Sequence, residues 1–250
     1  MVSLKLKNAI FRKVVNFEEA RSKCPQGRKR KASLAYLLDR ILYICRTGCQ
    51  WINLPVETVS PKTVFRHFTV WSRACIFEGA FYDEVRIKTV RSKILVADTS
   101  FVKNVYGRDV LGKNPTDRGR RATKISLLTD GLGMPVTAVF HQANRSDCKT
   151  LPHLLTTANR KVPGILAKFS MITADKGYDS DECRRTCRVY GLEPMITKRG
   201  QKDSAKERYV IERTFGILDQ FRRIKLRYEA KIHAFKSFHF IALLSVLLPR

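Results

Sequence analysis

The chain has 250 residues, of which 44% are hydrophobic, so it can build one large core or two smaller ones, and general disorder is excluded. Lys and Arg number 48 against 22 Asp and Glu, and the net charge of +26 far exceeds the charge of about 2–8 that keeps a small domain soluble. This balance excludes a preference for cationic substrates and favours a polyanion, with nucleic acid ahead of a membrane surface.

Two segments in the first third of the chain have the apolar periodicity of amphipathic helices. The segment 33–46 has Ser33 as its predicted N-cap, and residues 60–75 begin with Ser60 as N-cap and Pro61 at the first helical position. The apolar stripe of the first helix consists of Leu34, Leu37, Leu38, Ile41 and Ile44 or Cys45. A helical domain is therefore predicted over residues 1–90.

The second of these helices carries basic residues away from its apolar face, among them Lys62 and Arg66. Two helices joined by a short turn, with a basic second helix, fit a helix-turn-helix that binds DNA. A generic helix pair is the alternative interpretation. A basic, turn-rich segment at 25–32 precedes both helices, and its GRKRK motif at 27–31 is suited to phosphate binding or to nuclear import.

From residue 93 the pattern changes to short apolar runs that are typical of strands. KILVAD at 93–98 is a buried-strand pattern that ends in a carboxylate. ATKISLLTD at 122–130 and MPVTAVFH at 134–141 alternate in hydrophobicity on either side of an Asp-Gly turn. Strand, turn and strand predict a β-hairpin.

The rest of the chain alternates between predicted helices and strands. Helices are expected at 147–161, 180–191 and 204–223, and strands at 168–175 and 193–197. An antiparallel hairpin followed by strand–helix–strand units implies a mixed sheet flanked by helices. The predicted fold class is therefore α/β for residues 91–250.

Two of the predicted strands end in a carboxylate, and a third carboxylate lies on the last predicted helix. If the two strands are neighbours, Asp98 and Asp175 emerge at the same edge of the sheet. Glu212 lies one position from the apolar stripe of its helix. Gly216, one turn later, lowers helix propensity and suggests the close approach of another backbone or of a ligand.

Three converging carboxylates repel one another unless one is protonated or a cation lies between them. Mg²⁺ removes this conflict, because it prefers carboxylate, water and phosphate oxygens. Two such ions about 4 Å apart activate a water or sugar hydroxyl and stabilise the leaving oxygen of a phosphodiester. Other acidic residues are alternative candidates for the metal-binding set, although positions in turns or at helix N-caps explain most of them. These rivals are Asp130, Asp147, Asp179 and Asp181.

The seven cysteines do not have the spacing of a zinc site. Cys45 and Cys49, and likewise Cys183 and Cys187, lie four residues apart, without CxxC-type pairs or histidines at matching positions. Reduced, partly buried intracellular thiols are expected instead. Charges interrupt the N-terminal apolar residues, so no signal peptide is expected, and the apolar run 240–248 is shorter than the roughly 20 residues that span a bilayer.

Four local sequences together resemble the transposases of bacterial insertion sequences, specifically the large DDE group named after insertion sequence five, to which Harbinger-type transposases are related. They are RTGCQWINLP (46–55), GKNPTDRGRRATK (112–124), ADKGYDSD (174–181) and ERTFGILDQFRRIKLRYE (212–229). The resemblance runs from about residue 32 to the C-terminus. It implies a ribonuclease H-like catalytic core, whose element order matches the order predicted above.

The resemblance also implies an Asp-Asp-Glu triad that binds two Mg²⁺ or Mn²⁺ ions. The first Asp of the family falls on Asp98 in VADTS, the second on Asp175 in ADKGYDS, and the Glu on Glu212 in YVIERTFG. Many relatives have Arg or Lys two turns after the Glu, where this chain has Asp219. The expected catalytic and metal-binding residues are therefore Asp98, Asp175 and Glu212.

Basic residues near these motifs are expected to contact DNA phosphates, which position a duplex without reading its sequence. The loop 107–121, rich in Arg, Lys and Gly, is predicted to be a mobile segment that closes on a DNA end. A solvated charged surface is the alternative for any one of these residues. The predicted DNA-binding residues are Lys62, Arg66, Arg118, Arg120, Arg121, Lys124, Arg208, Arg222, Arg223, Lys225 and Arg227.

The sequence as a whole predicts a DNA transposase with a helical DNA-binding domain at 1–90 and a catalytic domain at 91–250. It would cleave transposon ends with metal ions and transfer the freed 3′ hydroxyl into target DNA. A catalytically inactive or domesticated DNA-binding repressor, and a ribonuclease H-like nuclease without strand joining, are the alternatives. The expected partners are double-stranded DNA, as terminal inverted repeats and target, and further copies in a homodimer or higher oligomer, but no membrane. The expected location is the cytoplasm and nucleoid of a bacterium, or the nucleus of a eukaryote.

Overall fold

The protein is described by a computed structural model over residues 3–22, 31–198 and 208–249. The chain divides into two compact units. Unit 1 comprises Met1–Glu84 together with Leu218–Arg250, and unit 2 comprises Val85–Ile217. The functional division into 1–90 and 91–250 stays a prediction. Residues 27–30 of the GRKRK motif and 204–207 of the expected last helix lie outside the described residues.

Unit 1 is built from helices at both ends of the chain. Ser33 accepts a hydrogen bond from Tyr36 N and Ser60 one from Thr63 N, with Pro61 in the first turn, so the predicted N-caps are confirmed. The helices are α1 (Leu4–Ser22), α2 (Leu34–Thr47), α3 (Pro61–Arg73), α4 (Ile76–Ile87), the short α8 (Arg222–Lys225) and α9 (Ile232–Leu247).

Helix α9 is buried on nearly all sides and supplies much of the core of unit 1. The ring of Phe238 stacks on Phe68 of α3 with the centroids 4.4 Å apart, and Phe238 O accepts from Cys45 Sγ of α2. The N-terminal helices are therefore confirmed, but residues 48–60, with the 3₁₀ helix Trp51–Asn53, separate α2 from α3. This connection is longer than the three- to four-residue turn of a helix-turn-helix.

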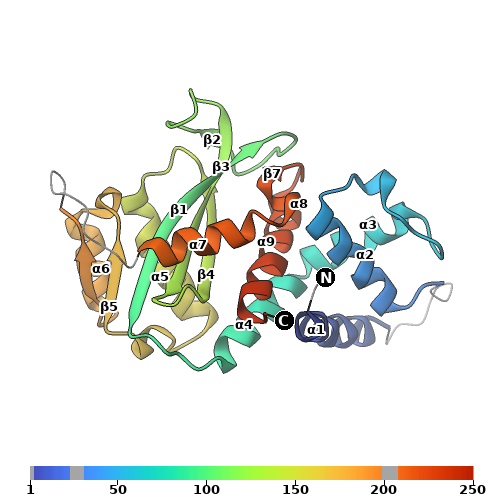
Figure 1. The fold of residues 1–250 in the computed structure, drawn as a ribbon, viewed down its shortest axis with the longest axis horizontal. Helices are drawn as coiled ribbons and strands as arrows, with labels where there is room; N and C mark the ends of the chain where they lie inside the picture. The colour runs from blue at the N-terminus through green and yellow to red at the C-terminus, as the bar shows by residue number, and fades with distance from the viewer. Residues whose placement is uncertain (1–2, 23–30, 199–207, 250) are drawn as a thin grey trace. The chain divides into compact units, whose positions relative to one another are not determined.

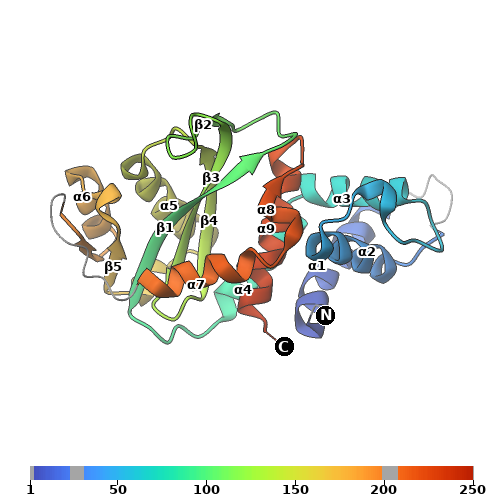
Figure 2. The ribbon, with the colours of Figure 1, turned by 45° about the horizontal axis from the view of Figure 1, so that its top comes forward.

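Unit 2 contains a mixed sheet whose strands run in the order β4-β3-β1-β5-β6, with the short β2 also paired to β3 (Figures 1 and 2). β3 is antiparallel to β1 and β4, whereas β5 is parallel to β1 and β6. This mixed sheet agrees with the predicted α/β class and with the ribonuclease H-like core that the resemblance implies, whereas the order of the strands within the sheet was not predicted. The strands are β1 (Ile94–Asn104), β2 (Gly112–Lys113), β3 (Arg121–Asp130), β4 (Pro135–Gln142), β5 (Met171–Ala174) and β6 (Glu193–Ile196).

Helices cover both faces of this sheet. Helix α5 (Asp147–Lys161) lies on one face and α7 (Tyr209–Leu218) crosses β1 on the other, while α6 (Asp181–Val189) lies near β5 (Figures 1 and 2). Two contacts join α7 to the β3–β4 turn: Thr214 Oγ1 donates to Gly133 O at 2.8 Å, and Arg213 Nη2 donates to Leu132 O at 2.9 Å.

The structure bears on two further expectations, the predicted helix 204–223 and the question of a membrane-spanning helix. The predicted helix 204–223 is interrupted, because α7 ends at Leu218 and α8 begins at Arg222. Across the described ranges, each helix is too short or too polar to cross a membrane.

Candidate active site

The pairing of β1 with β5 brings two predicted catalytic aspartates to the same end of the parallel ladder, although β1 continues to Asn104, so Asp98 lies within its strand and not at the strand end that the sequence predicted. Ala97 pairs with Ala174 at the end of the parallel ladder, and Asp98 and Asp175 are the residues that follow them. Asp98 Oδ1 accepts a hydrogen bond from Thr99 N at 2.8 Å. Asp175 is the N-cap of a single 3₁₀ turn, Lys176–Tyr178. The strand register therefore fixes both backbones.

One guanidinium contacts both carboxylates. Arg208 Nη2 lies 3.6 Å from Asp98 Oδ2, and Arg208 Nη1 lies 3.6 Å from Asp175 Oδ1. The Arg208 side chain is 19% exposed. Arg208, predicted from sequence as a DNA contact, is therefore an ion-pair partner of the two aspartates in this structure.

Glu212 on α7 lies close enough to affect the ionisation of Asp98. Burial is the main cause that raises the pKa of Asp98, and the charges of Asp175 and Glu212 raise it further. The Thr99 N–H and the Arg208 guanidinium lower the pKa of Asp98 but do not cancel the effect of burial. Three acidic groups thus share one electrostatic environment.

Gly216 does not mark a close approach, contrary to the sequence-based interpretation. A Cβ atom built on Gly216 meets no atom within 4 Å, so neither backbone nor side chain of the described residues requires glycine there. Glu212 itself is exposed on the same helix.

The carboxylate oxygens of Asp98 and Asp175 are ligands that a hard divalent cation prefers. The Arg208 guanidinium already places a positive charge beside both of them. Among the residues that the structure describes, no three His, Cys, Asp or Glu side chains are grouped closely enough to hold a metal ion. Arg208 provides the compensating charge between Asp98 and Asp175 here. The carboxylate oxygens are therefore suitable ligands for a divalent metal ion. Arg208 must move before such an ion can contact both aspartates.

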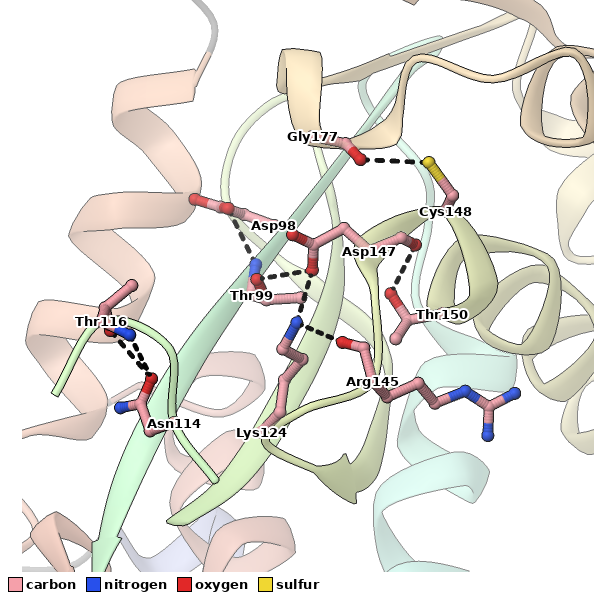
Figure 3. Close-up of polar contacts among 10 residues, drawn as sticks. All are labelled: Asp98, Thr99, Asn114, Thr116, Lys124, Arg145, Asp147, Cys148, Thr150 and Gly177. Atoms are coloured by element: carbon pink, nitrogen blue, oxygen red, sulfur yellow. Dashed lines mark hydrogen bonds and ion pairs between the residues drawn. The ribbon is translucent and has the colours of Figure 1, made fainter. Parts of the chain in front are cut away.

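Asp147, a rival acid in the sequence, starts α5 close to Asp98 and Thr99 of β1 (Figure 3). Its Oδ1 lies 3.0 Å from Lys124 Nζ and accepts from Thr99 Oγ1 at 3.2 Å. Lys124 also donates to Arg145 O at 2.6 Å, and its side chain is only 4% exposed. Lys124 is therefore a buried ion-pair residue and not an exposed phosphate contact, contrary to the prediction.

Tyr178 is a buried residue of this region that sequence reasoning missed. Burial raises the pKa of its phenol well above the usual value, and the charges of Asp147 and Asp98 add to the rise. The nearby hydroxyl groups of Thr99 and Thr150 act in the opposite direction, although the Tyr178 hydroxyl forms no hydrogen bond with the described residues. Its position three residues after Asp175 in the KGYD stretch was the available signal.

The basic segment around residue 118 is a hydrogen-bonded turn. The buried Asn114 accepts from Thr116 N at 3.0 Å and from Thr116 Oγ1 at 2.9 Å (Figure 3), and its carbonyl accepts from Gly119 N at 3.0 Å. Arg118 has a positive φ of 49°. These bonds close a turn over residues 114–120, and the mobility expected of the loop 107–121 stays a prediction. The exposed basic side chains at and directly after this turn are Arg118, Arg120 and Arg121.

The two buried arginines of RRIKLRYE belong to the interior of unit 1. Arg223 Nε donates to Glu229 Oε1 at 2.6 Å, and Arg227, which is 0% exposed, donates to Glu229 O at 3.3 Å. Arg223 and Arg227 are therefore not on the exposed basic surface, and that part of the prediction is wrong. The predicted basic residues that are exposed in unit 1 are Lys62, Arg66, Arg222 and Lys225.

Three of the described cysteines are buried, as predicted for small apolar side chains. They are Cys45, Cys183 and Cys187. Burial raises the pKa of the Cys183 thiol to about 11 and that of the Cys187 thiol to about 12. These thiols are therefore poor nucleophiles at neutral pH.

Two family models cover most of the chain. Residues 89–247 match the model described as "Transposase DDE domain", and residues 6–81 match the model described as "Putative transposase of IS4/5 family". The resemblance inferred from the motifs is thereby confirmed.

Two curated relatives have similar sequences. The putative transposase for insertion sequence element IS402 of Burkholderia cepacia is 39% identical over 137 residues, which are 51% of this chain and 64% of the relative. The transposase for insertion sequence element IS1106 of Neisseria meningitidis serogroup B is 33% identical over 130 residues, which are 46% of this chain and 42% of the relative. The chain thus spans less than two thirds of the length of either relative.

Solved structures with a similar arrangement have low identity. The catalytic domain of Mos1 mariner transposase is 12% identical, with a TM-score of 0.37, and the match covers 77% of this chain and 95% of that domain. The catalytic core domain of BIV integrase is also 12% identical, with a TM-score of 0.37, over 64% of this chain and 86% of that core.

Proposed function

This chain belongs to the family of transposases with a DDE domain, and from that premise we propose that it is a DNA transposase. It cleaves DNA at the ends of a mobile element and joins the freed 3′ hydroxyl to target DNA. The observation that carries the assignment is the juxtaposition of Asp98 and Asp175, both contacted by Arg208, with the charge of Glu212 acting on Asp98.

In this proposal Asp98, Asp175 and Glu212 hold divalent metal ions, two Mg²⁺ or Mn²⁺ per site. When bound, such ions activate the attacking water or hydroxyl and stabilise the leaving oxygen of the phosphodiester. The chain's own residues set the geometry. The β1–β5 register fixes two carboxylates, and the contacts of α7 with the β3–β4 turn fix the helix that carries the third.

The exposed basic residues support a double-stranded DNA partner. Arg118 and Arg120 lie on the turn that hydrogen bonds at Asn114 close, and Arg121 begins β3 directly after it. Lys62 and Arg66 on α3, with Arg222 and Lys225, add positive charge to unit 1. These side chains contact phosphates of the element's terminal inverted repeats and of the target. The protein acts as a homodimer or higher oligomer on DNA, in the cytoplasm of a bacterium.

A cleavage assay tests the proposal. The substrate is a linear duplex that carries the inverted repeats flanking the gene, incubated with the full chain and Mg²⁺. Asp175→Asn is expected to abolish nicking and strand joining while DNA affinity stays nearly unchanged, because the amide keeps the shape but loses the charge. Asp181→Asn, an exposed acid on α6, is the matched control.

Three outcomes separate the candidate activities. Nicked and joined products identify a transposase, and nicking without joining identifies a nuclease. DNA binding without metal-dependent nicking identifies an inactive, repressor-like protein. Normal cleavage by Asp175→Asn removes Asp175 from the mechanism.

A further inference from the structure

Asp147, the first residue of α5, lies beside the strand that carries Asp98. Its Oδ1 accepts a hydrogen bond from Thr99 Oγ1 at 3.2 Å, and the N–H of the same threonine donates to Asp98 Oδ1 at 2.8 Å (Figure 3). One residue of β1 thus binds Asp98 through its backbone and Asp147 through its side chain. A displacement of Asp147 therefore moves the N–H group that orients Asp98.

Asp147 also contacts the turn that follows Asp175. A Cβ atom built on Gly177 would lie only 3.2 Å from Asp147 Oδ2, so the carboxylate rests against this glycine. The neighbouring Cys148 Sγ donates to Gly177 O at 3.2 Å (Figure 3). The start of α5 therefore fixes the Lys176–Tyr178 turn, and Asp175 is the N-cap of that turn.

Lys124 fixes the Asp147 carboxylate in this position. Its ammonium group lies 3.0 Å from Asp147 Oδ1 and donates to Arg145 O at 2.6 Å, with almost no exposure to solvent. A buried ammonium needs a counter-charge, and the carboxylate of Asp147 lies where it can provide one. Thr99 and Lys124 both contact Oδ1, so Asp147 joins these two side chains to the start of α5.

From these contacts we propose that Asp147 is a positioning residue, which holds Asp98 and Asp175 at the separation that a divalent cation requires. The inference rests on the proposed function, since it assumes that these two aspartates bind the cation. Groups that orient metal ligands without touching the metal typically change metal affinity 10–100-fold when they are removed. Asp147 acts on both ligands at once, through Thr99 on one side and Gly177 on the other.

The test measures the dissociation constant of Mn²⁺ for the full chain by electron paramagnetic resonance, without DNA. Asp147→Asn is expected to weaken Mn²⁺ binding by about 10–100-fold. Thermal unfolding in the absence of metal shows whether the variant is folded. A purely structural role lowers the unfolding temperature but leaves the Mn²⁺ affinity of the folded protein unchanged.

A second variant removes the link without changing any charge. Thr99→Val deletes the hydroxyl that donates to Asp147 but keeps the N–H that donates to Asp98. It is expected to weaken Mn²⁺ binding by about 3–10-fold, the effect of one hydrogen bond. Weaker Mn²⁺ binding by Thr99→Val cannot arise from lost long-range attraction between a carboxylate and a cation, because this variant keeps every charge. Asp181→Asn, an exposed acid in the first turn of α6, is the matched control and keeps the wild-type affinity.

Asp98→Asn separates the failure of this inference from the failure of the proposed function. If the wild-type protein binds Mn²⁺ and Asp98→Asn does not, the metal site is where the proposed function puts it. Wild-type Mn²⁺ affinity in both Asp147→Asn and Thr99→Val then overturns the positioning role alone. If Mn²⁺ binding does not depend on Asp98, both proposals are overturned.

Discussion

Ala97 and Ala174 pair across the parallel strands β1 and β5, and the residue that follows each of them is an aspartate. The spacing of Asp98 and Asp175 is therefore a property of the strand register. A slip by one residue would turn one carboxylate to the opposite face of the sheet. Arg208, which contacts both side chains, stabilises the pair at this register by compensating their charge.

If Asp98 and Asp175 bind a divalent cation as proposed, Arg208 competes with that cation for the same two carboxylates. Arg208→Gln is therefore expected to tighten Mn²⁺ binding by about 3–10-fold at low salt, since a unit positive charge at a few ångströms costs the cation on the order of 1 kcal/mol. Mn²⁺ titration of the full chain measures the change, and Arg185→Gln on the exposed side of α6 is the control. Equal or weaker binding by Arg208→Gln would show that the arginine does not compete with the metal.

Arg223 and Glu229 form a buried ion pair in unit 1. Glu229→Gln leaves the Arg223 guanidinium without its charged partner, and the loss of one member of a buried pair costs about 3–5 kcal/mol. Both tryptophans of the chain, Trp51 and Trp71, lie in unit 1, so urea unfolding followed by their fluorescence reports on this unit. The exposed Glu57→Gln is expected to change the free energy of unfolding by less than about 0.5 kcal/mol. A similar small change for Glu229→Gln would contradict a stabilising role.

His239 makes the stability of unit 1 depend on pH. Burial within α9 lowers its pKa from 6.5 to about 4. The unfolded chain therefore binds a proton below pH 6.5 that the folded protein does not bind until about pH 4. The stabilising contribution is complete above pH 6.5 and is lost as the pH falls towards 4, by about 3 kcal/mol in total.

The measurement for His239 compares two chains across the same pH range. Fluorescence-detected urea unfolding between pH 7 and pH 4 is expected to show a smaller loss of stability in His239→Gln than in the wild type. Other titrating groups affect both proteins alike. Parallel curves for the two proteins would mean that His239 titrates normally.

Arg118, Arg120 and Arg121, at and directly after the turn closed by Asn114, are expected to contribute to DNA affinity through counterion release. Each of Arg118→Ala, Arg120→Ala and Arg121→Ala should reduce the slope of log affinity against log salt by about 0.9 if that side chain neutralises one phosphate. Fluorescence anisotropy with a labelled duplex at several salt concentrations measures the slope. Arg160→Ala, at the C-terminal end of α5, is the control. An unchanged slope in all three turn variants would remove this turn from the DNA-binding surface.

Local patterns predicted most of the regular structure of unit 2. The helix predicted at 147–161 has the same bounds in the structure, and the hairpin strands differ by one residue at their ends. These segments have strong periodicity and clear turn signals, so local and tertiary preferences agree. Helix α1 was not predicted individually, although Leu6, Ile10 and Val14 recur at helical spacing and are buried. The charges between them obscured the pattern.

The environments of the charged residues could not be predicted from the pattern. The alternation of RRIKLRYE suggests a basic face, but Arg223 and Arg227 are buried because Glu229 provides both a carboxylate and a carbonyl acceptor nearby. Lys124 is buried for the same reason, through Asp147. Whether a Lys or Arg side chain faces solvent or an internal acceptor depends on its contacts in the folded protein. Some of these contacts join residues far apart in the sequence, and others form within a local bend of the chain. Asp98 and Asp175 lie close together because β1 pairs with β5, a pairing that the sequence analysis left as a condition, and the choice of these two acids came from the family resemblance.

The division of the chain also bears on its synthesis. Unit 2 is one continuous segment, whereas unit 1 needs α9, whose Phe238 fills the space beside Phe68. During translation the first four helices emerge long before the residues that complete their interior. The middle of the protein can therefore acquire its fold on the ribosome first, while the early helices wait with apolar surface exposed, the condition in which chains aggregate or recruit chaperones.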